Sequence, residues 1–84
     1  MSPADQLIPL SMLAAGDTAV VQSVVGSTEL VRHLAEIGVH AGALLEMMRA
    51  GSTCILRVDG TKICVRGDEL LQVLVTPLPA RHSA

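Results

Sequence analysis

Short apolar runs separated by glycine-containing turns make up most of the chain. The segment 18–25 is rich in β-branched residues and is followed by Gly26, which is typical of a strand. The same criteria predict four further strands, at 43–49, 53–58, 61–66 and 70–76. The strongest local signal is the pair Asp59-Gly60 between two of these strands, because Asp-Gly favours the two-residue turn of a β-hairpin.

One segment has helical rather than strand spacing. Ser27 or Thr28 can cap a helix N-terminus, an acid follows at position 29, and apolar residues recur at 30, 34 and 37. Gly38 comes next, at the place where helices commonly end in a left-handed residue. A single helical turn is also expected within 10–13, because its two leucines fall on one side.

These elements predict a small antiparallel β-barrel that is mostly β, with five strands and one or two short helices. A barrel is expected because closing a sheet removes its exposed edges. The folded domain is predicted over residues 7–76, between a disordered N-terminus at 1–6 and a flexible, proline-containing C-terminal tail at 77–84. At 84 residues, the chain has room for one domain.

Composition removes several classes of function. The chain has no Phe, Trp or Tyr, so it lacks the aromatic platforms on which single-stranded nucleic acids stack and the aromatic groove that binds proline-rich peptides. Its net charge of −2 has the wrong sign for nucleic-acid backbones or anionic membranes. No basic leader or long apolar run is present, so we expect a cytoplasmic protein without membrane insertion.

The predicted hairpin separates the two cysteines. A two-residue loop at Asp59-Gly60 places Ile55 opposite Cys64 and Cys54 opposite Val65. Because side chains alternate along a strand, Cys54 then lies on the apolar face and Cys64 lies on the opposite, basic face. The two thiols therefore cannot form a disulfide within the chain or ligate one metal together.

Residues with catalytic or metal-binding chemistry are dispersed. The chain has no phosphate-binding loop, dinucleotide fingerprint or Cys-x-x-Cys pair, and His33, His40 and His82 do not have the spacing of helical metal ligands. The adjacent carboxylates Asp68 and Glu69 have no nucleophile with an oriented base beside them. We therefore predict no enzyme activity, no cofactor and no metal site within one chain.

Several strands carry apolar residues on both faces, although a small barrel has only one interior. Some of these residues will be covered by the helix or the N-terminal turn, and the others will form an exposed patch of the kind that marks interaction surfaces. The candidate partner surface consists of Leu44, Met47, Met48 and Leu74. The sequence does not decide whether the chain also forms homo-oligomers.

Several short motifs follow one another in a fixed order along the chain. They are a Leu-x-x-Leu-x-x-Gly opening, a strand ending in Gly, a Leu-x-x-Ile-Gly-Val-x-x-Gly core, and an Arg that closes the fourth strand before an acidic turn. Their main positions are Leu13, Gly16, Gly26, Leu34, Gly38, Gly42 and Arg66. This order of motifs resembles the FeoA family (ferrous iron transport protein A).

The resemblance implies an SH3-like barrel that supports ferrous iron uptake. Its implied partner is the FeoB-type membrane transporter, which has a cytoplasmic GTP-binding region, and no catalytic residue is implied. A first alternative is a free-standing regulatory module related to the C-terminal domain of iron-dependent repressors of the diphtheria toxin repressor type. A second alternative is a metal-binding chaperone that acts as an oligomer.

Overall fold

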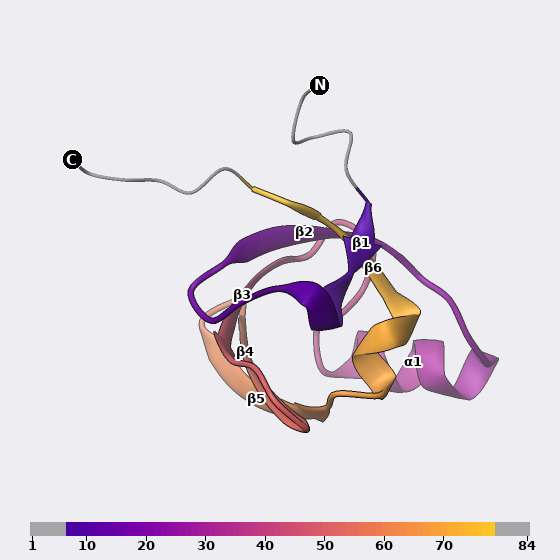
Figure 1. Cartoon of the computed structure of the whole chain (residues 1–84). Coiled ribbons are helices and arrows are strands. Elements are labelled where there is room, and N and C mark those ends of the chain that lie inside the picture. Colours follow the sequence, from indigo (N-terminus) through magenta and orange to yellow (C-terminus); the bar gives the residue numbers. More distant parts are fainter. Residues whose placement is uncertain (1–6, 79–84) are drawn as a thin grey trace.

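A six-stranded antiparallel sheet, bent around an apolar core, forms most of the molecule (Figure 1). The computed structural model describes residues 7–78. Its strands follow the order β1-β6-β2-β3-β4-β5, so β1 and β5 are the two edges of the sheet. The elements along the chain are β1 (Ile8–Pro9), the 3-10 helix η2 (Leu10–Met12), β2 (Thr18–Val24), α1 (Thr28–Glu36), β3 (Leu44–Arg49), β4 (Thr53–Val58), β5 (Thr61–Arg66), the 3-10 helix η3 (Glu69–Gln72) and β6 (Val73–Pro77).

The mostly β fold is confirmed, but the predicted count of five strands is wrong. The additional strand, β1, is only two residues long and pairs with β6, and it is too short to give a strand pattern of its own. Pro9 lacks a backbone N–H, which an edge strand tolerates. No backbone pairing joins β1 to β5 among residues 7–78, so the barrel is not closed by hydrogen bonds.

The last strand lies further along the chain than predicted. The first part of the predicted strand 70–76 belongs to η3, and β6 begins at Val73 and runs to Pro77. The N–H of Leu78 also donates to the Thr18 carbonyl at 2.9 Å. β6 and this bond therefore reach past residue 76, where the folded domain was predicted to end. The predicted disordered N-terminus at 1–6 and all but the first two residues of the predicted tail at 77–84 lie outside the described residues.

Helix α1 has a defined cap at each end. The Ser27 hydroxyl accepts a hydrogen bond from the Leu30 N–H at 3.1 Å, as an N-cap does. At the other end, the N–H groups of Gly38 and Val39 donate to the carbonyls of Ala35 and Leu34, the pairing of a Schellman motif. Leu34 and Val39 are both fully buried, so this cap ties the end of the helix to the core.

The predicted register of the β4–β5 hairpin is confirmed at every position. Cys54 pairs with Val65 and Ile55 pairs with Cys64, without a shift along the six pairs. Cys54 is buried and Cys64 is exposed, and both are free thiols. Asp59 and Gly60 have φ of 52° and 79°, as a type I′ turn requires.

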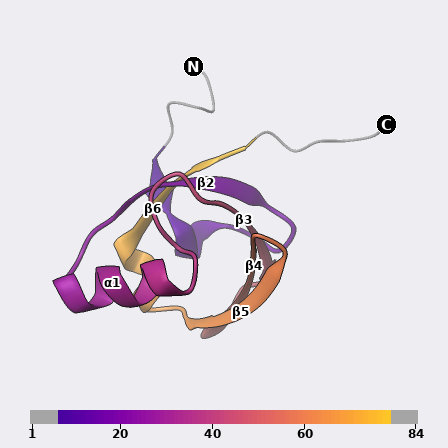
Figure 2. The same ribbon diagram turned by 180° about the vertical axis from the view of Figure 1, so that it is seen from behind.

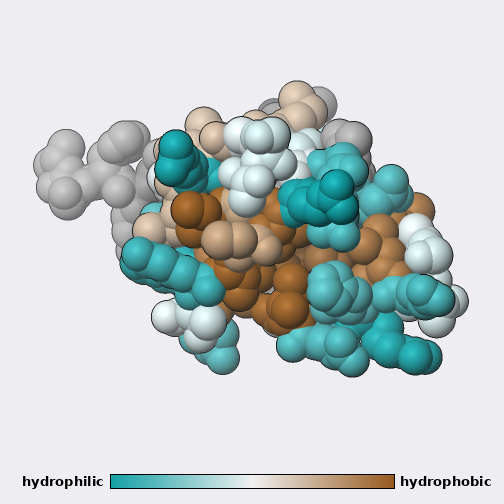
Figure 3. Space-filling view, turned by 90° about the horizontal axis from the view of Figure 1, so that it is seen from below, coloured by the Kyte–Doolittle hydropathy of each residue, from teal (hydrophilic) through white to brown (hydrophobic). Residues whose placement is uncertain are grey.

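The core contains aliphatic side chains from the sheet, η2 and α1, and the connecting loops add to it. Its fully buried members of large volume are Leu10, Leu34, Leu45, Met47, Leu56, Val21, Val39, Val73 and Val75. Seen from behind, α1 lies beside the curved sheet and does not cross its interior (Figure 2). Figure 3 shows apolar side chains gathered in the middle of one face, bordered by hydrophilic ones.

Candidate functional site

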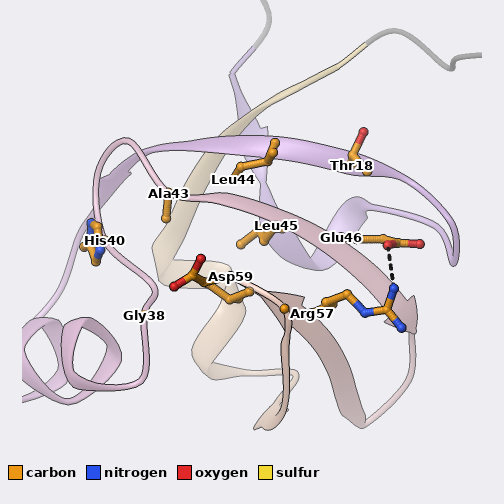
Figure 4. Close-up of a pocket in the computed structure, with 11 residues that line it drawn as sticks. Thr18, Gly38, His40, Ala43, Leu44, Leu45, Glu46, Arg57 and Asp59 are labelled. Atoms are coloured by element: carbon orange, nitrogen blue, oxygen red, sulfur yellow. Dashed lines mark ion pairs between the residues drawn. The ribbon is translucent and has the colours of Figure 1, made fainter.

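A groove of about 550 Å³ opens where β3 begins and β4 ends (Figure 4). Its apolar lining includes the buried side chains of Ala43, Leu45 and Val58, and also Leu44, which is 58% exposed. The remaining lining residues are Thr18, Gly38, His40, Glu46, Arg57, Asp59 and Gly60. The groove thus combines an apolar surface with a charged and polar rim.

Two turns form the ends of this groove. The type I′ turn at Asp59-Gly60 supplies one side. The link between α1 and β3 supplies the other, and it is held by the Ala43 N–H, which donates to the His40 carbonyl at 3.0 Å. The same link is joined to β2, because the Gly42 N–H donates to the Val21 carbonyl at 2.7 Å. Backbone hydrogen bonds therefore fix the shape of the groove.

Gly38 occupies the point where the helix end meets the sheet. Its φ is +100°, in the left-handed region, and a Cβ built there would lie 3.1 Å from Cγ1 of Val58. The conformation favours glycine, and a Cβ at this separation would also require the Val58 side chain to shift by a few tenths of an ångström. Among the predicted motif positions, Gly38 is the one that lines the groove.

The charged rim contains an ion pair across two strands. Glu46 and Arg57 are directly opposed in the β3–β4 ladder, and a guanidinium nitrogen of Arg57 lies 3.9 Å from a carboxylate oxygen of Glu46 (Figure 4). Both side chains are partly exposed, so the pair contributes only about 0–1 kcal/mol to stability. On the other side of the groove, Nδ1 of His40 lies 3.1 Å from the Ala41 carbonyl oxygen and donates to it.

The candidate partner surface is divided by the structure. Leu44 is exposed in the groove, whereas Met48 and Leu74 are partly buried and do not line it. Met47 is fully buried, so its assignment to an exposed surface is wrong. The cause is the alternation along β3, which turns Leu45 and Met47 inward, followed by a bulge that leaves Met48 without a partner on β4.

The other motif positions lie apart from one another. Leu13 and Leu34 are buried in the core. The Gly16 N–H donates to the Met47 carbonyl at 2.7 Å, which ties the N-terminal turn to β3. Gly26 lies against the start of α1, where a Cβ would meet the Leu30 side chain at 3.0 Å. Arg66, at the end of β5, is exposed and opposes Thr53.

The structure keeps the metal-ligating residue types apart. His33 is exposed on α1, His40 is in the groove, and His82 lies outside the described residues. Within residues 7–78, no group of three or more His, Cys, Asp or Glu side chains is placed to hold a metal ion. In the same part of the chain, no helix has the length and apolar character needed to cross a bilayer.

Sequence reasoning missed the pairing that forms the groove. Asp59 and Gly60 were recognised as a turn, but neither they nor the Glu46–Arg57 pair was assigned to a site. The opposite charges of Glu46 and Arg57 are a signal for cross-strand pairing. A two-residue turn at Gly51-Ser52 would place Ala50 opposite Thr53 and therefore Glu46 opposite Arg57, as the structure does, so this signal was present in the sequence.

Comparison with known structures gives the same fold. The FeoA protein from Chlorobium tepidum is 29% identical, with a TM-score of 0.80 over 90% of this chain and 75% of that one. The FeoA of Stenotrophomonas maltophilia, solved in complex with zinc and described as an SH3 domain protein, is 27% identical, with a TM-score of 0.73 over 84% of this chain and 95% of that one. The predicted SH3-like fold is therefore confirmed.

A longer protein shares the fold over part of its length. The T. acidophilum IdeR is 21% identical, with a TM-score of 0.78 over 90% of this chain but only 36% of its own. A search of curated proteins finds no match. The model of the FeoA domain matches residues 8–77, which include every strand of the sheet. This chain therefore belongs to the FeoA family.

Proposed function

We propose that this chain is a cytoplasmic accessory protein of ferrous iron uptake that docks on the GTP-binding region of a FeoB-type membrane transporter. Membership of the FeoA family supports the assignment to iron uptake. The Stenotrophomonas maltophilia relative is described in terms of activating bacterial ferrous iron transport. The proposed role is recognition of a partner, without a catalytic step.

The exposed Leu44 in the groove carries the proposal. An apolar groove with a charged rim suits an apolar anchor side chain of a partner, because binding energy in interfaces concentrates where such an anchor is fully desolvated. The buried Leu45 and Val58 give the groove a packed base, while Leu44 offers apolar area that only a partner can cover. The Glu46–Arg57 pair and Asp59 on the rim can orient the partner.

The test is the affinity for the isolated cytoplasmic region of FeoB, measured by calorimetry with and without a GTP analogue. Leu44→Asp is expected to weaken binding by about thirtyfold, in the range of a substituted interface hot spot. Val25→Asp is the matched control, because Val25 is 55% exposed and does not line the groove. Far-UV circular dichroism of each variant establishes that it is folded.

Each result has a distinct meaning. Weak binding by Leu44→Asp together with normal binding by Val25→Asp supports docking through the groove. Equal binding by both variants and the unaltered chain would move the interface elsewhere on the protein. No binding by the folded, unaltered chain in either nucleotide state would refute the transporter as partner.

The two alternatives predict different partners. A regulatory module related to the repressors would bind a separate DNA-binding chain instead of FeoB. The likeness to IdeR extends to the fold alone, so it does not favour this alternative. A metal chaperone would bind ferrous iron or zinc near stoichiometrically under anaerobic, reducing conditions and would lose the metal on His40→Ala or Cys64→Ser.

A further inference from the structure

The two edges of the sheet differ in how they are protected. β1 is two residues long and contains Pro9, so it offers little backbone for another strand. β5 is six residues long, contains no proline, and pairs with β4 without a bulge. Its outer side is a regular strand edge at the rim of the sheet (Figure 1).

Alternate residues of β5 direct their backbone groups away from β4. In a two-residue hairpin, the residues that flank the turn form a hydrogen-bonded pair, and bonded pairs then alternate along the ladder. The Gly67 N–H bond to the Ser52 carbonyl, 2.8 Å long, shows that this alternation continues to the far end. The residues bonded to β4 are Thr61, Ile63 and Val65. The residues whose N–H and C=O groups face outward are Lys62, Cys64 and Arg66.

The outward backbone groups have no partner in the sheet. Within residues 7–78, no backbone–backbone hydrogen bond reaches them from another segment. The side chains of the same three residues are exposed, on the face opposite Cys54 and Val65. The free edge and the exposed side chains are therefore contributed by the same residues.

This side of the sheet is basic although the protein is acidic overall. Four of the six Lys and Arg residues of the chain lie on β3, β4 and β5, where the sole carboxylate is Glu46. They are Arg49, Arg57, Lys62 and Arg66. Two of them flank Cys64 on the free edge.

The positive charges on β5 disfavour pairing between the β5 strands of two copies of this chain. If two β5 strands paired antiparallel about Cys64, Lys62 of each copy would face Arg66 of the other, and directly opposed like charges destabilise a strand pair. An acidic strand would instead place carboxylates opposite both cations. Charge complementarity thus favours a different, acidic partner.

We propose that β5 is a strand-addition site for an extended acidic segment of a partner protein. The outward N–H and C=O groups of Lys62, Cys64 and Arg66 hydrogen-bond to the added backbone. The two cations select acidic side chains that stand four positions apart on one face of that segment. None of the three residues lines the groove, so the inference does not depend on FeoB docking there.

The probe is a synthetic nine-residue peptide of Val and Thr with two Glu four positions apart, titrated into the full chain and followed by NMR and amide hydrogen exchange. Exchange of the Lys62, Cys64 and Arg66 amides is expected to slow by about tenfold or more when the peptide is bound, because these amides become paired. The Ile63 and Val65 amides, already bonded to β4, change little.

Controls separate strand addition from simple charge attraction. Lys62→Glu or Arg66→Glu is expected to weaken binding of the Glu peptide by about tenfold, whereas Arg32→Glu, on the exposed side of α1, leaves it unchanged. A peptide N-methylated at alternate residues keeps its charge but cannot extend the sheet, and is expected not to bind. The proposal would be overturned if the N-methylated peptide, a peptide with Lys in place of Glu, or a DNA 12-mer bound as tightly as the Glu peptide. It would also be overturned if the chain associated with itself through β5 as its concentration is raised.

Discussion

Replacing Gly38 by alanine tests how the end of the helix is built into the core. The residue has φ of +100°, and L side chains in the left-handed region cost about 1–2 kcal/mol. The new Cβ would also lie 3.1 Å from Cγ1 of Val58, a side chain that is itself buried and must move by a few tenths of an ångström. That displacement adds about 1 kcal/mol, the lower end of the cost of overpacking. Gly38→Ala is therefore expected to destabilise the protein by about 2–3 kcal/mol.

Gly42 provides a matched control for the backbone contribution. Its φ is +90°, close to that of Gly38, but a Cβ there would have nothing within 4 Å. Gly42→Ala is therefore expected to cost only the conformational part, about 1–2 kcal/mol. In a double-mutant cycle, Val58→Ala should remove the steric part of the Gly38→Ala effect, giving a coupling energy of about 1 kcal/mol.

The assay is urea unfolding followed by far-UV circular dichroism, since a chain without Trp, Tyr or Phe has no useful intrinsic fluorescence. For a domain of this size, each 1 kcal/mol corresponds to a change of about 4–8 °C in the melting temperature. Equal destabilisation by Gly38→Ala and Gly42→Ala, or a coupling energy near zero with Val58→Ala, would refute the steric argument. Backbone strain alone would then explain the glycine.

Three further tests address the N-cap of α1, the core and the β4–β5 hairpin. Ser27→Ala removes the N-cap oxygen of α1 and should cost about 1 kcal/mol in urea unfolding; no change would show that the cap is dispensable. Met47→Ala should lower the free energy of unfolding by about 2–5 kcal/mol and Leu44→Ala by less than about 1 kcal/mol, because only Met47 is buried. A larger loss for Leu44→Ala than for Met47→Ala would contradict the β3 register. In the folded protein, maleimide should modify Cys64 rapidly and Cys54 only after denaturant is added, as read by mass spectrometry, and equal rates would contradict their placement on opposite faces.

Local chemistry explains the features that were predicted correctly. The Asp59-Gly60 turn fixes the β4–β5 register because a two-residue loop leaves one pairing, and the two cysteines follow from it by alternation. The end of α1 at Gly38 is equally local, since the Schellman hydrogen bonds join residues within a single turn. Each of these predictions depends on neighbours along the chain.

The errors arose where the partner strand is distant in sequence. β1 is a strand only because Ile8 and Pro9 pair with β6 from the other end of the chain. Likewise, Leu44 is exposed in a groove because two turns that are separated in sequence meet beside it. The error at Met47 has a more local cause: Met47 and Met48 are the same residue type, and the alternation along β3 turns Leu45 and Met47 inward before the bulge at Met48.

The sequence alone determined five of the six strands, helix α1, the hairpin register, the aromatic-free core and the family motifs, because these depend on residue type and short spacing. Only the tertiary structure decided which face of β3 is covered, which sheet edge stays open, and that the groove exists. These features depend on pairing between distant segments, and a one-residue shift in such a pairing reverses the faces of an entire strand. The groove beside Leu44 and the open edge of β5, the two surfaces proposed for partners, both result from that long-range pairing.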